Sequence, residues 1–376
     1  MNQATSPFVN VSHYSRNETV AIAKAIGILL MVLGHSGCPA VVSNFLSFYH
    51  MPLFFFLSGF FFNIGYREDY IPYIVKKIKG LWLPFVKWSL IFLALHNVLY
   101  YCCIETDLLS FHDTLIRLFQ IPFMFGNDQL LGGYWFLNDL FYVTVFTTIF
   151  FFLIYRINKR INPPVLLAFY SVLSFIAFLI LISLSFNSSN SIIVILTKYS
   201  YSLITFVIGI ILATTFKSPK LEKVFSIISP ITNSWLIIIA AFVILLLGAF
   251  YYPASRSAIG SLSTVAGLYM LVMALIGIYF TCAISHKIKN IAPSSLKRHL
   301  VFIGDSTLII LTWHFLSFKI VSFAYVLIRQ LPLRMAAEHP TIHAYSNNRG
   351  GWILYFIVGA IIPIMIAYYK QQKVNR

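Results

Sequence analysis

The sequence predicts an all-α polytopic integral membrane protein with about ten transmembrane helices and both termini in the cytoplasm. Of its 376 residues, 59% are apolar or aromatic and only 10% are charged, and the mean hydropathy is +0.83. Water-soluble domains average about 25% charged residues, so a soluble enzyme is excluded. Helix is the expected state, because backbone polar groups in lipid must be paired within their own segment.

Ten apolar stretches have about the 20 residues that a helix needs to cross the hydrocarbon layer. They are 19–37, 46–66, 80–101, 134–155, 164–186, 192–216, 231–252, 261–282, 301–328 and 350–370. The short alternating strands that mark a transmembrane barrel are absent.

Local signals refine several of these stretches. The first follows a polar segment without the layout of a signal peptide, so it is expected to remain as an anchor. The second contains Pro52, which predicts a break, and then Ser58 and Gly59, which predict close helix packing. The ninth includes Gly304-Asp305-Ser306, which predicts a turn at the inner face. The other stretches are predicted from their apolar length alone.

The distribution of Lys and Arg predicts the orientation. With a cytoplasmic N-terminus, the inside segments hold 18 of the 27 basic residues, the outside segments hold five, and four lie within spans. The opposite orientation would reverse this bias, against the positive-inside rule. The predicted organisation is a cytoplasmic segment 1–18, a membrane domain 19–370 and a cytoplasmic tail 371–376. The net charge of +16 is explained by this topology, and no nucleic-acid partner is expected.

Two ionisable residues of the first span, Lys24 and His35, are candidates for function. They are eleven residues apart, about three helical turns, so they share one face and lie roughly 16 Å apart along the axis. Ionisable groups inside a membrane are costly and mark functional sites. The pair is suited to an anionic cytoplasmic ligand at Lys24 and a base at His35. The alternative is that Lys24 extends to the interface and His35 bonds to a neighbouring helix.

Further polar residues are predicted to lie at about the depth of His35. They are His50, Trp135, Asp139 and His314, the last beside Trp313. Three His at one depth favour a site over unrelated structural bridges. None of these His has the i, i+3 or i, i+4 spacing of a helical ligand pair, so no metal is expected.

A basic cluster follows the second span. Lys76, Lys77 and Lys79 could meet phosphates, although positive-inside topology explains them equally well. On the other side, segments 102–133 and 329–349 are candidates for a surface that faces an acceptor. Apolar residues at helical spacing in the first of these, from Phe111 to Phe119, predict either a helix on the membrane surface or an ordinary packed loop helix.

These residues together resemble the membrane acyltransferase-3 family, whose first helix carries a basic residue, ten residues and then His. The resemblance covers nearly the whole chain, and its strongest part, residues 24–59, looks like the fucose 4-O-acetylase-like branch. The resemblance rests on the spacing of Lys24 and His35 and on four stretches, 27–35, 48–59, 133–137 and 311–314. Family members often have Arg-x-x-Arg near the third span. Here Lys76 and Lys79 take those places and lack the planar fork for bidentate phosphate contacts.

The resemblance implies an acyltransferase that moves an acyl group, commonly acetyl, from cytoplasmic acyl-CoA to a hydroxyl of a glycan or lipid-linked sugar. Lys24, helped by Lys76, Lys77 and Lys79, would bind the donor, and His35 would act as general base or transiently carry the acyl group. His50, Trp135, Asp139 and His314 would support His35 or bind the acceptor. No permanently bound cofactor is expected, and the location is the bacterial cytoplasmic membrane. The alternatives are a transporter or flippase for an anionic or glycan substrate, and a non-catalytic scaffold.

Overall fold

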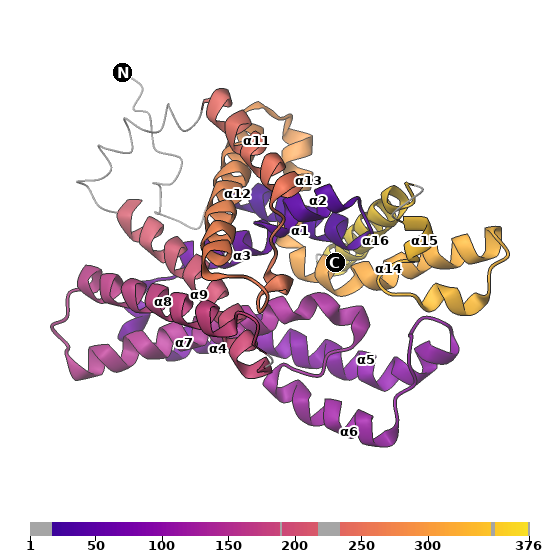
Figure 1. Ribbon diagram of the computed structural model, residues 1–376, viewed down its shortest axis with the longest axis horizontal. Helices are drawn as coiled ribbons and strands as arrows, with labels where there is room; N and C mark the ends of the chain where they lie inside the picture. The colour runs from indigo at the N-terminus through magenta and orange to yellow at the C-terminus, as the bar shows by residue number, and fades with distance from the viewer. Residues whose placement is uncertain (1–16, 189, 217–233, 347–349, 375–376) are drawn as a thin grey trace. The chain divides into compact units, whose positions relative to one another are not determined.

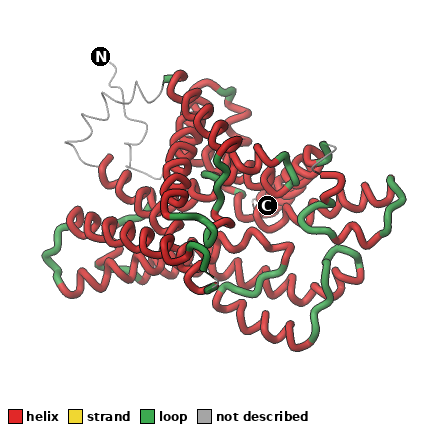
Figure 2. Tube along the Cα trace, viewed as in Figure 1, coloured by secondary structure: helices red, strands yellow, loops and turns green. Residues whose placement is uncertain are grey.

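The computed structural model describes residues 17–374, except 189, 217–233 and 347–349 (Figure 1). The described residues form helices joined by loops, with no strand among them (Figure 2). Most of the predicted N-terminal segment, residues 1–16, lies outside the described residues, as do 375–376 of the predicted tail and the basic residues of 217–233.

Within the described residues, nine helical stretches are long and apolar enough to cross a membrane, which confirms an all-α polytopic membrane protein. They are α1 (Glu18–His35), α2 with α3 (Ala40–Ser47, His50–Phe60), α4 through η2 to α5 (Ile71–Lys77, Ile78–Trp82, Leu83–Tyr101), η4 with α7 (Gln129–Tyr134, Trp135–Ile157), α8 (Pro163–Ser185), α9 (Ser191–Phe216), α12 (Thr264–Ile291), α14 (Thr307–Ile328) and α16 (Trp352–Val374). The remaining predicted span, 231–252, forms the shorter apolar helix α11 (Trp235–Tyr251) of 17 residues.

Several predicted spans have different limits in the structure, such as 80–101, which begins at Ile71, and 261–282, which ends at Ile291, and two spans are interrupted. The stretch predicted at 46–66 runs from Ala40 to Phe60 and is interrupted between α2 and α3. Pro52 lies in the first turn of α3, where its missing N–H removes no helical hydrogen bond, so the helix restarts just before it. His50 therefore begins α3 in the interior of the stretch rather than near its end. The stretch predicted at 301–328 is divided at Ser306 into α13 (Ser294–Asp305) and α14, where the turn was predicted.

The chain forms two compact units. The first comprises residues 1–27, 44–70 and 146–305, as far as these are described. In this unit α3 packs along α9, α8 packs along α9, and α11 packs along α12 (Figure 1). The predicted small-residue packing is found here, because Gly59 of α3 lies directly against the backbone of Phe206 in α9.

The second unit comprises residues 28–43, 71–145 and 306–376, as far as these are described. Here α14 packs against α16, η4 and η6 (Leu333–Ala337). The segments predicted to face outward contain α6 (Phe111–Gln120), η3 (Ile121–Phe123) and α15 (His343–Ser346). These segments contact each other, since Arg334 donates hydrogen bonds to the carbonyls of Tyr100 and Thr106, at 2.7 and 2.9 Å.

Candidate functional site

The structure brings His35 and His314 together in the second unit. His35 is the last residue of α1 and is half-buried, whereas His314 lies within α14 and is fully buried. Their ring centroids are 5.5 Å apart, and the ring of Phe315 lies 4.9 Å from that of His35. Two of the three His predicted to share a layer are thus neighbours.

Hydrogen bonds determine which nitrogen of His314 carries its proton. Nδ1 lies 3.2 and 3.0 Å from the carbonyl oxygens of Ile310 and Leu311. A carbonyl only accepts, so Nδ1 must be the donor and Nε2 of the neutral ring holds a lone pair. Nε2 is buried and has no hydrogen-bond partner among the described residues. The ring is therefore oriented by its own helix and presents a proton acceptor on its other side.

Two glycines allow η4 to pack closely against this part of α14. A Cβ at Gly133 would lie 2.7 Å from Cδ1 of Leu311 and 3.7 Å from Cε1 of His314, so a side chain would not fit without movement. The next residue, Tyr134, is buried and its hydroxyl forms a 2.8 Å hydrogen bond with that of Thr312. The Gly-Gly-Tyr sequence thus fixes the start of α7 beside the turn of α14 that carries His314.

Trp135 and Asp139 follow on the first turns of α7. They are four residues apart, so they lie on the same face of the helix. Trp135 is half-buried and Asp139 is buried. Beside His314 in the chain, Trp313 belongs to an aromatic cluster, with the ring of Trp88 at 5.1 Å and that of Phe92 at 6.4 Å.

The remaining predicted site residues are Lys24, His50 and the basic cluster at 76, 77 and 79. Lys24 is half-buried on the same continuous helix as His35, as the spacing predicts, and belongs with His50 to the first unit. The basic residues 76, 77 and 79 lie on α4 and η2 rather than in a loop. Lys77 places its ammonium 5.0 Å from the ring centre of Tyr73, and its two lysine neighbours are exposed.

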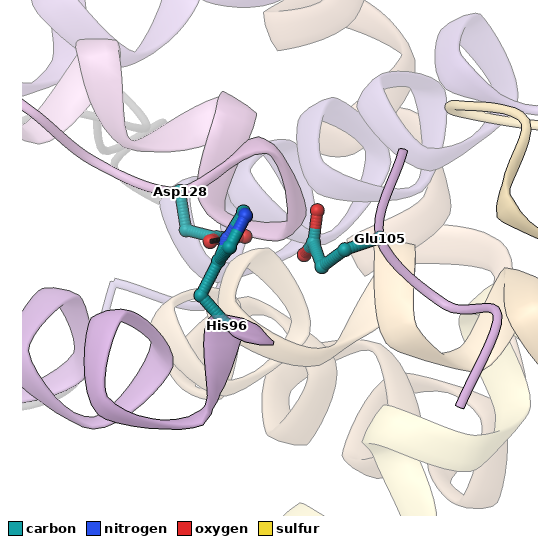
Figure 3. Close-up of side chains that lie close together, drawn as sticks. All are labelled: His96, Glu105 and Asp128. Carbon is teal, nitrogen blue, oxygen red and sulfur yellow. Dashed lines mark hydrogen bonds and ion pairs between the residues drawn. The ribbon is translucent and has the colours of Figure 1, made fainter. Parts of the chain in front are cut away.

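A second polar cluster lies in the second unit, formed by His96, Glu105 and Asp128 (Figure 3). Nδ1 of His96 lies 2.6 Å from Oδ2 of Asp128, and Nε2 lies 3.0 Å from the carbonyl oxygen of Asp107. One donor atom from each of the three residues lies within 4.8 Å of the others, so they could hold a metal ion.

The electrostatics of this cluster follow from burial. Burial and the neighbouring Asp128 raise the pKa of Glu105 to about 10. The pKa of Asp128 is lowered despite its burial, because its carboxylate accepts hydrogen bonds from His96 and from the amide of Leu130. Burial, with a contribution from Lys319, also lowers the pKa of His339 to about 4, and the ring of His339 packs 4.7 Å from that of Phe315.

Sequence reasoning did not single out the cluster or His339 for function. Its members are separated by 9 and 23 residues along the chain and share no helical spacing. Lys319 is one of the four basic residues within the predicted spans. In the structure it is buried and donates to the carbonyls of residues 336, 337 and 338, at 3.3, 2.9 and 2.8 Å. The one signal in the sequence that could have indicated these residues is their position within or near the ends of spans, where an ionisable side chain is energetically costly and often has a function.

Comparison with protein families gives one match, to the acyltransferase domain family (acyltransferase 3), over residues 18–369. No curated protein and no solved structure matches the chain significantly. The match covers the helices of both units, including His35, His314 and the cluster around His96.

Proposed function

The chain belongs to the acyltransferase domain family, and we propose that it is a membrane O-acyltransferase acting on a glycan or lipid-linked sugar. The donor in this proposal is acyl-CoA, acetyl-CoA in the simplest case. The observation that carries the proposal is the pair of His35 and His314, two imidazoles 5.5 Å apart in a membrane domain of this family. A fucose 4-O-acetylase-like specificity is the finer form of the proposal, supported by the sequence of residues 24–59.

His35 is the general base in this mechanism. Its imidazole accepts the proton of the acceptor hydroxyl while the oxygen attacks the thioester carbonyl. The new C–O bond forms, the C–S bond breaks, and the CoA thiolate leaves and takes up the proton from His35. An imidazole is suited to both transfers because its pKa lies near neutrality.

His314 orients the base. Its Nδ1–H is held by two carbonyl oxygens of its own helix, so the Nε2 lone pair has a fixed direction. An N–H of His35 that donates towards this lone pair, directly or through one water, would place the proton on that nitrogen and make the other nitrogen of His35 the base. Gly133 packs closely against the turn of α14 that carries His314.

The remaining residues are assigned to the two substrates. Lys24 lies eleven residues before His35 on α1 and meets the anionic part of the donor. Lys76 and Lys79, exposed one turn apart, add positive charge for its phosphates, with Lys77 beside them. Trp135 and Asp139 contribute to acceptor binding, because a ring and a polar group suit a sugar.

The test is acetyl-CoA binding and turnover by the purified protein in detergent, which needs no knowledge of the acceptor. Lys24→Ala is expected to weaken binding at least tenfold. His35→Ala is expected to retain binding but to lose the slow hydrolysis of acetyl-CoA in which water replaces the acceptor. Lys159→Ala, which removes an exposed charge between α7 and α8, is the matched control and should behave as wild type.

Two results would contradict the proposal. One is a folded wild-type protein that does not bind acetyl-CoA at millimolar concentration. The other is a Lys24→Ala variant that binds the donor as tightly as the Lys159→Ala control. A His35→Ala variant with undiminished hydrolysis would remove His35 from the role of base.

A further inference from the structure

Three side chains that commonly ligate metals converge inside the second unit from three separate segments. His96 lies in the last turns of α5, Glu105 lies in the turn that follows, and Asp128 is the N-cap residue of η4 (Figure 3). All three are buried, with exposures of 1%, 0% and 3%. Burial at this level is rare for charged residues without a partner.

The backbone around the cluster is held in place by its own hydrogen bonds. The side chain of Asn97 donates to the carbonyl of Leu109 at 3.0 Å and accepts from its amide at 2.9 Å, which closes the turn that carries Glu105. Oδ1 of Asp128 accepts the amide of Leu130 at 2.9 Å, so Oδ2 is left for the cluster. The three donors are therefore positioned by the fold and not by contact with one another alone.

His96 has the tautomer that a metal ligand needs. Its Nε2 lies 3.0 Å from the carbonyl oxygen of Asp107, and a carbonyl can only accept, so Nε2 carries a proton. Metal-bound His residues usually donate their second ring N–H to a backbone carbonyl or carboxylate in this way. Nδ1 is then the atom that faces the carboxyl groups. In the metal-free protein its proton lies in the 2.6 Å hydrogen bond to Oδ2 of Asp128, and an ion that displaces this proton would find a lone pair on Nδ1.

Glu105 supplies the independent observation that points to a ligand. When both carboxyls are ionised, neither oxygen of Glu105 has a hydrogen-bond partner among the described residues, and both oxygens are fully buried. A buried carboxylate is strongly unfavourable unless it is paired or coordinates a metal. The ammonium of Lys319 is already bound by three carbonyls, so it does not serve as a direct partner for these oxygens.

From this geometry we infer that His96, Glu105 and Asp128 bind one divalent cation of the zinc class. The two carboxylates balance the two positive charges of such an ion and the imidazole ligand is neutral, so the ion and its three ligands together carry no net charge. Nitrogen and oxygen donors at about 2.0–2.2 Å are usual for zinc, and three protein ligands leave a fourth position for water.

An ion at this position would join the end of α5 to the start of η4. The same element η4 carries Gly133, which packs against Leu311 and His314. The inference does not depend on the proposed acyl transfer, because the site is defined by its own ligands and is tested by metal content.

The experiment measures zinc in the purified, tag-free, full-length protein in detergent by mass spectrometry, after loading with zinc and removal of the excess. About one zinc per chain is expected in wild type. Glu105→Gln and Asp128→Asn each remove one ligand charge and are expected to weaken binding at least tenfold. Asp113→Asn, which removes an exposed carboxylate on α6, is the matched control and should retain about one zinc per chain.

X-ray absorption at the zinc edge of the wild-type protein gives a second measurement that does not rely on variants folding. One imidazole nitrogen with oxygen ligands supports the site. A folded wild-type protein without zinc overturns the inference, and so does a coordination shell dominated by sulfur or by several imidazoles. Zinc content that is unchanged in both Glu105→Gln and Asp128→Asn has the same consequence.

Discussion

The contact between α3 and α9 depends on two glycines, and Gly59→Ala tests it directly. A Cβ at Gly59 would lie 2.8 Å from the carbonyl carbon of Phe206 and closer still to its oxygen. The contact is reciprocal, because a Cβ at Gly209 would lie 2.8 Å from the backbone nitrogen of Phe60. Both obstacles are helix backbone, which cannot rotate away as a side chain would.

The expected cost follows from the shift that the new methyl group requires. Ordinary contact begins at 3.4 Å, so the carbonyl carbon alone requires the two helices to separate by about 0.6 Å, and the nearer carbonyl oxygen requires more. A gap of 0.5–1 Å forfeits roughly a quarter to a half of each dispersion contact along the interface. Overpacking of this kind costs about 1–3 kcal/mol. Because the obstacle is backbone, the cost lies at the upper end of this range. Alanine regains up to about 1 kcal/mol of helix propensity, so we expect a net loss of about 2 kcal/mol.

The assay is equilibrium unfolding in detergent, with Gly80→Ala as the matched control. Gly80 lies in the helical stretch η2, and a Cβ there would meet nothing within 4 Å. The control is therefore expected to be neutral or slightly stabilising, through propensity alone. A Gly59→Ala variant at least as stable as Gly80→Ala would refute the inference that backbone contact between α3 and α9 requires glycine.

Three further predictions concern the second unit. Lys319→Met leaves the carbonyls of 336–338 without their hydrogen-bond donor. We therefore expect faster amide hydrogen exchange across 329–346, measured by mass spectrometry. Unchanged exchange would contradict the inference that Lys319 holds this segment in place. His339 keeps its neutral form in the fold, with a pKa of about 4 against about 6.5 when unfolded. Below pH 6.5 the unfolded chain binds a proton at His339 that the folded chain does not, so the free energy of unfolding falls by up to about 3 kcal/mol between pH 6.5 and pH 4. We expect His339→Asn to reduce this fall, measured by unfolding at pH 7 and 4.5. An equal fall in both proteins would refute the burial of a neutral His339. On α6, Phe111 and Phe119 are 80% and 75% exposed, which is expected of a helix that lies on the membrane. Nitroxide labels at these two positions in proteoliposomes should therefore be more accessible to oxygen than to a water-soluble relaxing agent. The reverse order of accessibility would place α6 away from the bilayer.

The sequence by itself predicted the class of the protein and much of its helical layout. Lipid admits few backbone conformations, so long apolar stretches identify helices without knowledge of their neighbours. The same local logic placed Lys24 and His35 on one continuous helix and assigned Gly59 to close packing. It misjudged the limits of the second span, because apolar content does not show where a helix is interrupted and restarted.

Only the tertiary structure decided which polar groups meet. Partners such as His35 and His314, or Asp128 and His96, are separated by 279 and 32 residues, and their encounter depends on how whole helices pack. The sequence showed His314 as a ring in a span, whereas the fold shows which nitrogen donates and which is left to accept. Hydrophobic length is a property of each segment alone, but hydrogen bonding and ligation need a second group at a distance that only the packed chain sets.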